Sequence, residues 1–326
     1  MISLIDSTPN SVKPRYHSLT VQDTKTTNHT HITAYTRGWA LETAIRSALR
    51  GKASSLSNRV VQVQLFEQPP HPNTTASTTT TTTTMAEPNT LYQYSLLNAL
   101  MHGISTTGPT LSEVLQHGDH GLGTITRLNG EIVIIDSKAY HFPPDYTNLK
   151  PLPPTEQMPF LMITRFEPTL TKRLSAPLSM NTLDTALAPL LPAKQNHFLS
   201  VKIEGSFSVV RCRFVPAQER PRQSLKELGQ RVSPVEFRDV RGTLFGFWSP
   251  EYANGFSVAG FHLHFVAEGG EKGGHVTGFE VADEAVLGAA AIKDYRVELP
   301  DSEEFQEEVV TNAQAADLHA VEGARH

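Results

Sequence analysis

Three histidines in the last quarter of the sequence have the types and the spacing of metal ligands. His262 and His264 alternate with apolar residues within positions 261–265, which is the pattern of a strand with one apolar face. Side chains two positions apart on a strand share a face and lie roughly 6.6 Å apart, so both imidazoles can reach one ion. The glycines within 269–274 predict a turn, after which His275 begins the return strand with a third nitrogen. Three histidines with an open fourth position form the ligand set of a catalytic zinc site.

Three other interpretations of these histidines remain open at this point. An amphipathic strand can present two histidines to solvent without any metal. A cupin-type metal-dependent dioxygenase or isomerase is the main alternative, because His262 and His264 followed by Glu268 and Gly274 partly match the first cupin metal motif. The second cupin motif is missing after His275, which argues against it. A zinc-stabilised binding domain fits poorly, because structural zinc sites normally have four protein ligands.

The composition favours a soluble, cytoplasmic enzyme over other classes. The chain has 326 residues, 39% of them hydrophobic, which is enough for a sizeable core, and its apolar runs are too short to span a membrane. A single cysteine, Cys212, excludes an internal disulfide and a thiolate-rich metal site. The net charge of -5 is unevenly placed, with about +4 in residues 1–84 and about -9 in the remainder. An acidic body does not suggest nucleic acid as a partner.

Residues 1–84 are predicted to be an extension outside the catalytic fold. They end in seven consecutive threonines at 78–84, a low-complexity linker too polar to bury a core. Upstream, residues 39–50 have helical spacing and residues 60–66 resemble a short strand. Organelle targeting by this basic, hydroxyl-rich segment stays possible, although its four acidic residues weaken the idea. We favour a disordered extension, or translated sequence upstream of a start at Met85.

The remainder of the sequence predicts two successive groups of strands with short helices. In the first group, Asn129-Gly130 is a strong hairpin signal and Thr110 begins a capping-box pattern. The expected strands of both groups are 125–128, 132–135, 140–142, 161–166, 198–203, 206–215, 243–248, 260–266 and 275–281. The expected helical segments pass through Tyr94, Leu97 and Met101, run from Thr110 to Gly118, lie within 173–195 and cover 225–232.

Ordered short motifs across this region resemble the alpha-acetolactate decarboxylase family. Their combination and order are highly specific, and they say nothing about residues 1–84. His120 departs from the apolar or aromatic residue expected in its motif, so we interpret it as a structural or surface residue. The matching segments are 91–95 (LYQYS), 116–124 (QHGDHGLGT), 128–131 (LNGE), 158–160 (MPF), 164–166 (TRF), 202–207 (KIEGSF), 213–219 (RFVPAQE), 242–248 (GTLFGFW), 260–265 (GFHLHF) and 273–276 (GGHV).

The resemblance implies a zinc enzyme, a homodimer, that converts 2-acetolactate into acetoin and carbon dioxide. The family has an active-site Glu in its C-terminal tail, and Glu322 is the residue that matches it best. Cofactors other than Zn²⁺ are not expected. The residues that match the family's site are Thr124, Glu131, Arg213 and Glu322 for catalysis and His262, His264 and His275 for the metal.

The chemistry of that reaction explains these residue types. Loss of carbon dioxide leaves an electron pair that passes into the ketone as an enediolate, which a zinc ion stabilises as a Lewis acid. Arg213 can hold the substrate carboxylate or the enediolate, although without the resemblance it would be interpreted as part of a structural ion pair. Glu131 and Glu322 are candidates for the proton donor or for positioning water, and Thr124 for orienting Glu131 or the substrate.

The expected architecture is α/β in the mixed α+β sense, with two mixed-sheet lobes in one compact decarboxylase unit. The first lobe, residues 85–190, holds Thr124 and Glu131. The second lobe, residues 191–326, holds Arg213, the histidines and the C-terminal tail.

Overall fold

The computed structural model describes residues 17–22, 29–34, 87–145, 151–175 and 177–313. The chain divides into two units, residues 1–81 and residues 82–326. In the first unit, β1 (His17–Gln22) and β2 (His29–Ala34) pair antiparallel, two strands that the sequence analysis did not predict within its disordered extension. The helix expected at 39–50 and the strand expected at 60–66 lie outside the described residues.

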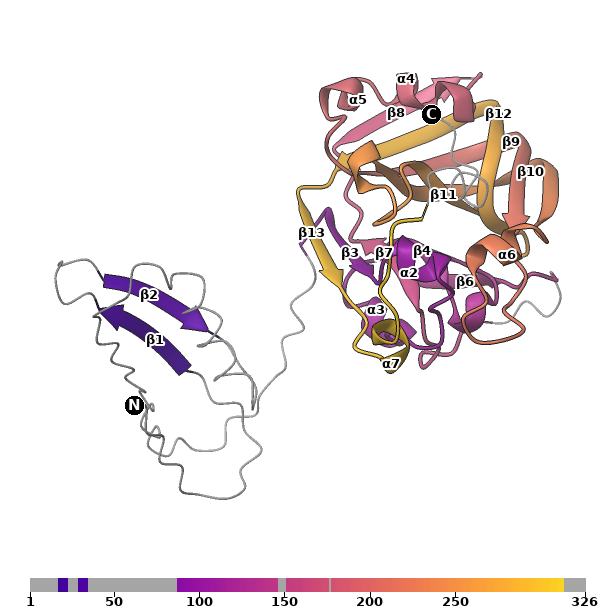
Figure 1. The fold of residues 1–326 in the computed structure, drawn as a ribbon. Helices are drawn as coiled ribbons and strands as arrows, with labels where there is room; N and C mark the ends of the chain where they lie inside the picture. The colour runs from indigo at the N-terminus through magenta and orange to yellow at the C-terminus, as the bar shows by residue number, and fades with distance from the viewer. Residues whose placement is uncertain (1–16, 23–28, 35–86, 146–150, 176, 314–326) are drawn as a thin grey trace, which may run out of the picture. The chain divides into compact units, whose positions relative to one another are not determined.

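The second unit contains a six-stranded mixed sheet in the order β13-β3-β7-β4-β5-β6. Its last strand along the chain, β13, pairs parallel with its first, β3, and Figure 1 shows these two strands side by side. All other neighbours in this sheet are antiparallel. The strands are β3 (Thr90–Tyr94), β4 (His120–Thr124), β5 (Glu131–Ile135), β6 (Lys138–Phe142), β7 (Phe160–Thr164) and β13 (Asp294–Glu298).

The second sheet has five strands, antiparallel throughout, in the order β11-β10-β9-β12-β8. A short pairing between β11 and β12 closes four of these strands into a ring. Because of this pairing β11 and β12 are neighbours, so the histidines that they carry lie close together. The strands are β8 (Leu170–Ser175), β9 (Leu199–Phe214), β10 (Ser233–Ser249), β11 (Gly260–Ala267) and β12 (Gly273–Ala291).

The helices among the described residues of the second unit are short, with three to five residues each. Among the described residues, none of the helices has the length and apolar character needed to cross a membrane. The α-helices are α2 (Leu97–Met101), α3 (Leu111–Val114), α4 (Leu183–Ala186), α5 (Leu190–Ala193), α6 (Leu225–Gly229) and α7 (Glu303–Gln306), and the 3₁₀ helices are η2 (Thr126–Leu128), η3 (Met180–Thr182) and η4 (Glu251–Ala253).

Alternation along the strands of the six-stranded sheet creates two apolar clusters. On β5, Ile132 and Ile134 pack with α3 in the smaller cluster on one face. Val133 and Ile135 belong to the larger cluster, which joins this sheet to the five-stranded sheet. Because side chains alternate along a strand, Glu131 shares the face of Val133 and points toward the five-stranded sheet. The α+β class expected from the sequence is confirmed.

The strand expected at 125–128 is wrong. The strand that precedes β5 and pairs with it is β4, whose last residue Thr124 lies opposite Glu131. The next residues leave the strand conformation, since Arg127 and Leu128 have positive φ angles of 61° and 56°. Tertiary contacts hold this turn: the Arg127 N–H donates to the Ser105 carbonyl at 2.8 Å.

The break expected between the strands at 198–203 and 206–215 is also wrong, because β9 runs unbroken from Leu199 to Phe214. Gly205 lies opposite Gly242 of β10 and Ala285 of β12, in the middle of the sheet. A side chain at position 205 would meet the Glu284 carbonyl oxygen at 2.8 Å. This glycine therefore permits close approach of a third strand and does not mark a turn.

Other expected elements shift by a few residues or change type. Tyr94 ends β3 and does not belong to the helix, which begins at Leu97. The segment expected to be helix and loop from residue 173 begins within β8, which pairs with β12. Consequently β8 lies in the five-stranded sheet and β13 in the six-stranded sheet, so the sheets exchange strands across the predicted boundary at residue 190.

Candidate metal and catalytic site

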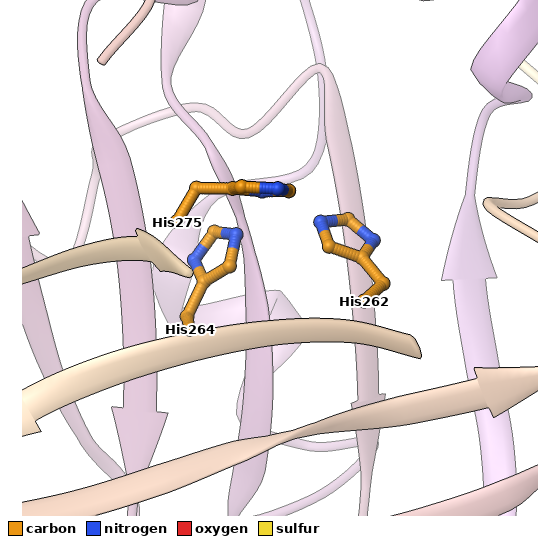
Figure 2. Close-up of side chains that lie close together, drawn as sticks. All are labelled: His262, His264 and His275. Carbon is orange, nitrogen blue, oxygen red and sulfur yellow. The ribbon is translucent and has the colours of Figure 1, made fainter. Parts of the chain in front are cut away.

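Three buried imidazoles form the centre of the site. The potential ligand nitrogens of His262, His264 and His275 all lie within 4.8 Å of one another. Their ring centroids are 5.0–5.2 Å apart, and Figure 2 shows the three rings facing a common space. Zinc–nitrogen bonds of about 2.0–2.1 Å keep two ligating nitrogens within about 4.2 Å of each other. A small shift of the rings is therefore enough for one ion to bind all three.

Strand register places these side chains together. His262 and His264 share one face of β11, as the alternation in the sequence predicted. His264 lies directly opposite His275 across the β11–β12 pairing, and His275 lies opposite Arg213 of β9. Gly274 precedes His275 with a φ of +137°, a conformation that side chains rarely adopt. The glycine-rich turn thus allows β12 to start its return beside β11.

His264 has the hydrogen-bonding arrangement of a metal ligand. Its Nδ1 lies 2.8 Å from the Ile132 carbonyl oxygen and must donate to it, which leaves the lone pair on Nε2. That Nε2 is buried and makes no hydrogen bond. Metal-bound histidines commonly donate their other nitrogen to a carbonyl in this way, which sets the tautomer and the ring orientation. The environment of Nε2 therefore fits a bound cation.

The charge state of the histidines also fits a metal. Burial lowers the pKa of the His264 imidazole to about 3; the hydrogen bond to Ile132 opposes this shift and the charge of Arg213 adds to it. Burial likewise lowers the pKa of His262 well below its ordinary value, with further contributions from His264 and Arg213. Neutral imidazoles have the free lone pairs that a metal ion requires.

Glu131 and Thr124 reach the site from the six-stranded sheet. A carboxylate oxygen of Glu131 lies 3.6 Å from His264 Nε2, and its side chain is 14% exposed. The Thr124 hydroxyl donates to the Gly130 carbonyl at 2.7 Å, across the turn that leads into Glu131. Thr124 therefore stabilises the local backbone that carries the carboxylate.

Two arginines of β9 differ sharply in their surroundings. Arg213 is buried, and its Nη2 lies 3.3 Å from His275 Nε2. Arg211 is 48% exposed and forms ion pairs with Glu236 at 3.0 Å and Glu280 at 3.4 Å. Strand alternation puts both arginines on one face, but only Arg213 reaches the histidines.

One small cavity, of about 40 Å³, contains six of the seven predicted site residues. The seventh, Glu322, lies outside the described residues. The sequence analysis did not find the apolar residues of the cavity wall, because they come from elements brought together only by folding. Val215 was missed as well, although its position two residues after Arg213 was a signal that could have found it. The lining residues are Leu97, Leu100, Gly123, Thr124, Leu128, Glu131, Phe160, Arg213, Val215, Leu225, His262, His264 and His275.

His120, also noted in the sequence, lies outside this cavity. It is buried, its Nδ1 is 2.7 Å from Asp119, and its Nε2 is 3.4 Å from Asp136. Its ring packs against Phe166 and Phe245, with centroid distances of 5.4 and 5.2 Å. These contacts agree with the structural role expected for His120.

Comparisons with known proteins show which family the chain resembles. The sequence profile of the alpha-acetolactate decarboxylase family matches residues 91–312. The chain is 38% identical to the alpha-acetolactate decarboxylase of Brevibacillus brevis, over 74% of this chain and 83% of that protein. It is 36% identical to that of Methanosarcina mazei, over 72% and 80%. The crystal structure of the Bacillus subtilis strain 168 enzyme superimposes with a TM-score of 0.68 at 31% identity, covering 72% of this chain and all of that chain.

Proposed function

Because the chain belongs to the alpha-acetolactate decarboxylase family and therefore decarboxylates acetolactate, we propose that it does so with a zinc ion and through an enediolate, releasing acetoin. His262, His264 and His275 would hold the ion. The observation that carries this proposal is the His264 ring, whose Nδ1 donates to Ile132 while its buried Nε2 faces the other two imidazoles.

When bound, the zinc ion supplies Lewis-acid chemistry, which stabilises the negative charge that develops on the substrate oxygens. Three neutral imidazoles leave the net positive charge of such a site intact. A cysteine-rich or carboxylate-rich ligand set would reduce it.

Arg213 is assigned to the anionic part of the substrate. Its guanidinium lies beside His275 within the buried cavity, where a charge-assisted hydrogen bond is stronger than in water. The substrate enters with a carboxylate, and the breaking C–C bond leaves its electron pair on the enediolate. A planar guanidinium can donate two hydrogen bonds to either species.

Glu131 is assigned to proton handling. It is the only acidic residue among the described residues that line the cavity. The enediolate must receive a proton on carbon to become acetoin, and a carboxyl group at the cavity wall can donate it directly or hold the water that does. Thr124 holds the turn in front of Glu131 through its bond to Gly130.

Glu322 stays a prediction for a second acid from the C-terminal tail. The homodimer also stays a prediction, and light scattering on the purified protein will check it. Family membership argues against the cupin-type alternative and the zinc-stabilised binding domain.

The test is metal analysis paired with acetoin formation from racemic acetolactate. We expect stoichiometric zinc, loss of turnover on complete chelation, and recovery when zinc is added back. Full turnover in metal-free protein would refute the metal proposal. Recovery with another divalent ion but not with zinc would replace zinc by that ion.

A further inference from the structure

The polar residues that line the cavity and much of its apolar lining come from different kinds of element. The histidines, Arg213 and Glu131 all belong to strands of the two sheets. Three of the apolar lining residues belong to helices, with Leu97 and Leu100 from α2 and Leu225 from α6. All three leucines are at least 94% buried. These three leucines are called the aliphatic wall below; the other large apolar lining residues are Leu128, Phe160 and Val215.

The substituents of the substrate are likewise polar and apolar. This inference rests on the proposed function, which names that substrate. The second carbon of 2-acetolactate carries a hydroxyl, a carboxylate, an acetyl group and a methyl group. The polar residues of the cavity can bind the oxygens of the first three groups. The methyl group has no polar atom, so the three leucines are the lining residues suited to contact it.

The position of α2 depends on contacts from outside the helix. With five residues, α2 is too short to be stable by itself. Its first turn is anchored to the loop after η4, where the Asn98 N–H donates to the Gly255 carbonyl at 2.7 Å. The side chain of Asn98, also buried, makes two further bonds. Its Nδ2 donates to Asn312 Oδ1 at 3.1 Å, and its Oδ1 accepts from the Ala313 N–H at 3.0 Å.

The segment that Asn98 binds, residues 302–313, also holds α6. The Glu304 carboxylate accepts from the Thr106 hydroxyl at 2.6 Å and from its N–H at 3.1 Å, just after α2. Arg222, which precedes α6, donates to the Glu304 carbonyl at 2.6 Å and pairs with Glu308 at 3.0 Å. One segment near the C-terminus therefore braces both helices of the aliphatic wall.

We propose that Leu97 and Leu100 determine which 2-alkyl group the enzyme accepts, and that residues 302–313 set the position of this wall through Asn98. Leu97 and Leu100 are specificity-determining residues in this account. Asn98 is a positioning residue, because it acts on the cavity through α2.

The first experiment compares two substrates that differ only in this group, 2-acetolactate and its homologue with a 2-ethyl group. The measured quantity is the ratio of kcat/KM for the ethyl substrate to kcat/KM for the methyl substrate. Shortening Leu100 to Ala opens room for an added methylene, which in an apolar pocket is worth about tenfold at the low end. We expect Leu100→Ala to raise the ratio by about tenfold, and Leu100→Val to raise it less.

Leu111→Ala is the matched control. Leu111 is as buried as Leu100, at 6% exposure, and also lies on a short helix, but it packs in the cluster on the opposite face of the six-stranded sheet. It should lose stability without changing the ratio. Should Leu100→Ala fail to fold, Leu100→Val decides the matter. An unchanged ratio in the Leu100 variant that folds, or an equal change in Leu111→Ala, would overturn the specificity assignment.

The second experiment tests whether residues 302–313 set the position of α2 through Asn98. Asn98→Ala removes both side-chain bonds to the segment, whereas Asn98→Asp keeps the acceptor for the Ala313 N–H and loses the donor. We expect the ratio to rise in Asn98→Ala and to rise less in Asn98→Asp, with zinc content unchanged in both. A merely structural asparagine would lower stability and leave the ratio at its wild-type value. Failure of the proposed function would instead appear in the wild type, as turnover without metal.

Discussion

The two sheets of the 82–326 unit contribute different chemistry to the cavity. The five-stranded sheet supplies the three histidines and Arg213, whose relative positions follow from strand pairing, with His264 opposite His275 and His275 opposite Arg213. The six-stranded sheet supplies Glu131, which reaches the histidines only because the sheets pack together. The bond from His264 to the Ile132 carbonyl joins the two sheets next to that carboxylate. The five-stranded sheet should therefore supply all the metal ligands, whereas turnover needs side chains from both sheets.

The largest expected effect comes from the five-stranded sheet. His264→Ala removes a metal ligand and the bond to Ile132, so zinc and activity should be lost together. Metal analysis and acetoin formation on the same sample measure this. A variant with stoichiometric zinc and normal turnover would exclude His264 as a ligand.

The control for that variant is His120→Phe. His120 is also buried, but its contacts are Asp119, Asp136 and two phenylalanine rings, outside the cavity. Zinc content and turnover should both stay nearly intact. Loss of zinc here would mean that the metal site depends on the six-stranded sheet as well.

Glu131→Gln should separate turnover from metal binding. The amide keeps the size of the side chain but cannot donate the proton, and positioned acids contribute typically about 10²–10⁴-fold. We expect kcat to fall by that order while zinc stays bound. Kinetics with metal analysis check this, and joint loss of zinc would place Glu131 among the ligands.

Two conservative substitutions on β9 compare the roles of its two arginines. Arg213→Lys should keep the fold and the zinc but lower turnover by about a hundredfold or more, because an ammonium cannot reproduce the planar pair of hydrogen bonds. Arg211→Lys should do much less, since Arg211 pairs with Glu236 and Glu280 near the surface. Steady-state kinetics distinguish them. Equal, small effects would make Arg213 a structural residue.

The smallest effect is expected outside both sheets. Residues 1–81 form a unit of their own, and every described site residue lies in the other unit. Deletion of residues 1–84 should leave the thermal midpoint, zinc content and turnover unchanged. Aggregation or zinc loss on deletion would show that the extension belongs to the catalytic fold.

The sequence alone was enough to select the three histidines, because the rule that places them is local. A strand has a side-chain period of two, so His262 and His264 had to share a face, and the glycines before His275 had to allow a return. The same local reasoning predicted strands at 132–135 and 140–142, and the structure pairs them as β5 and β6. It failed at residues 125–128, where contacts from Ser105, distant in sequence, hold positive φ angles at Arg127 and Leu128.

Local reasoning also failed at Gly205. A glycine in a sequence suggests a turn, but this one allows three strands to pack closely. Thr124, Glu131 and Arg213 were predicted from the family resemblance, but their contacts with the histidines were decided by tertiary structure. The meeting of Glu131 with His264 depends on how two sheets pack, and the parallel pairing of β13 with β3 joins strands 204 positions apart at Asp294 and Thr90. The aliphatic wall of Leu97, Leu100 and Leu225 depends on a segment near residue 310 that braces helices near residues 100 and 225. Alternation constrains neighbours along one strand, whereas these contacts exist only once the whole unit has buried its core.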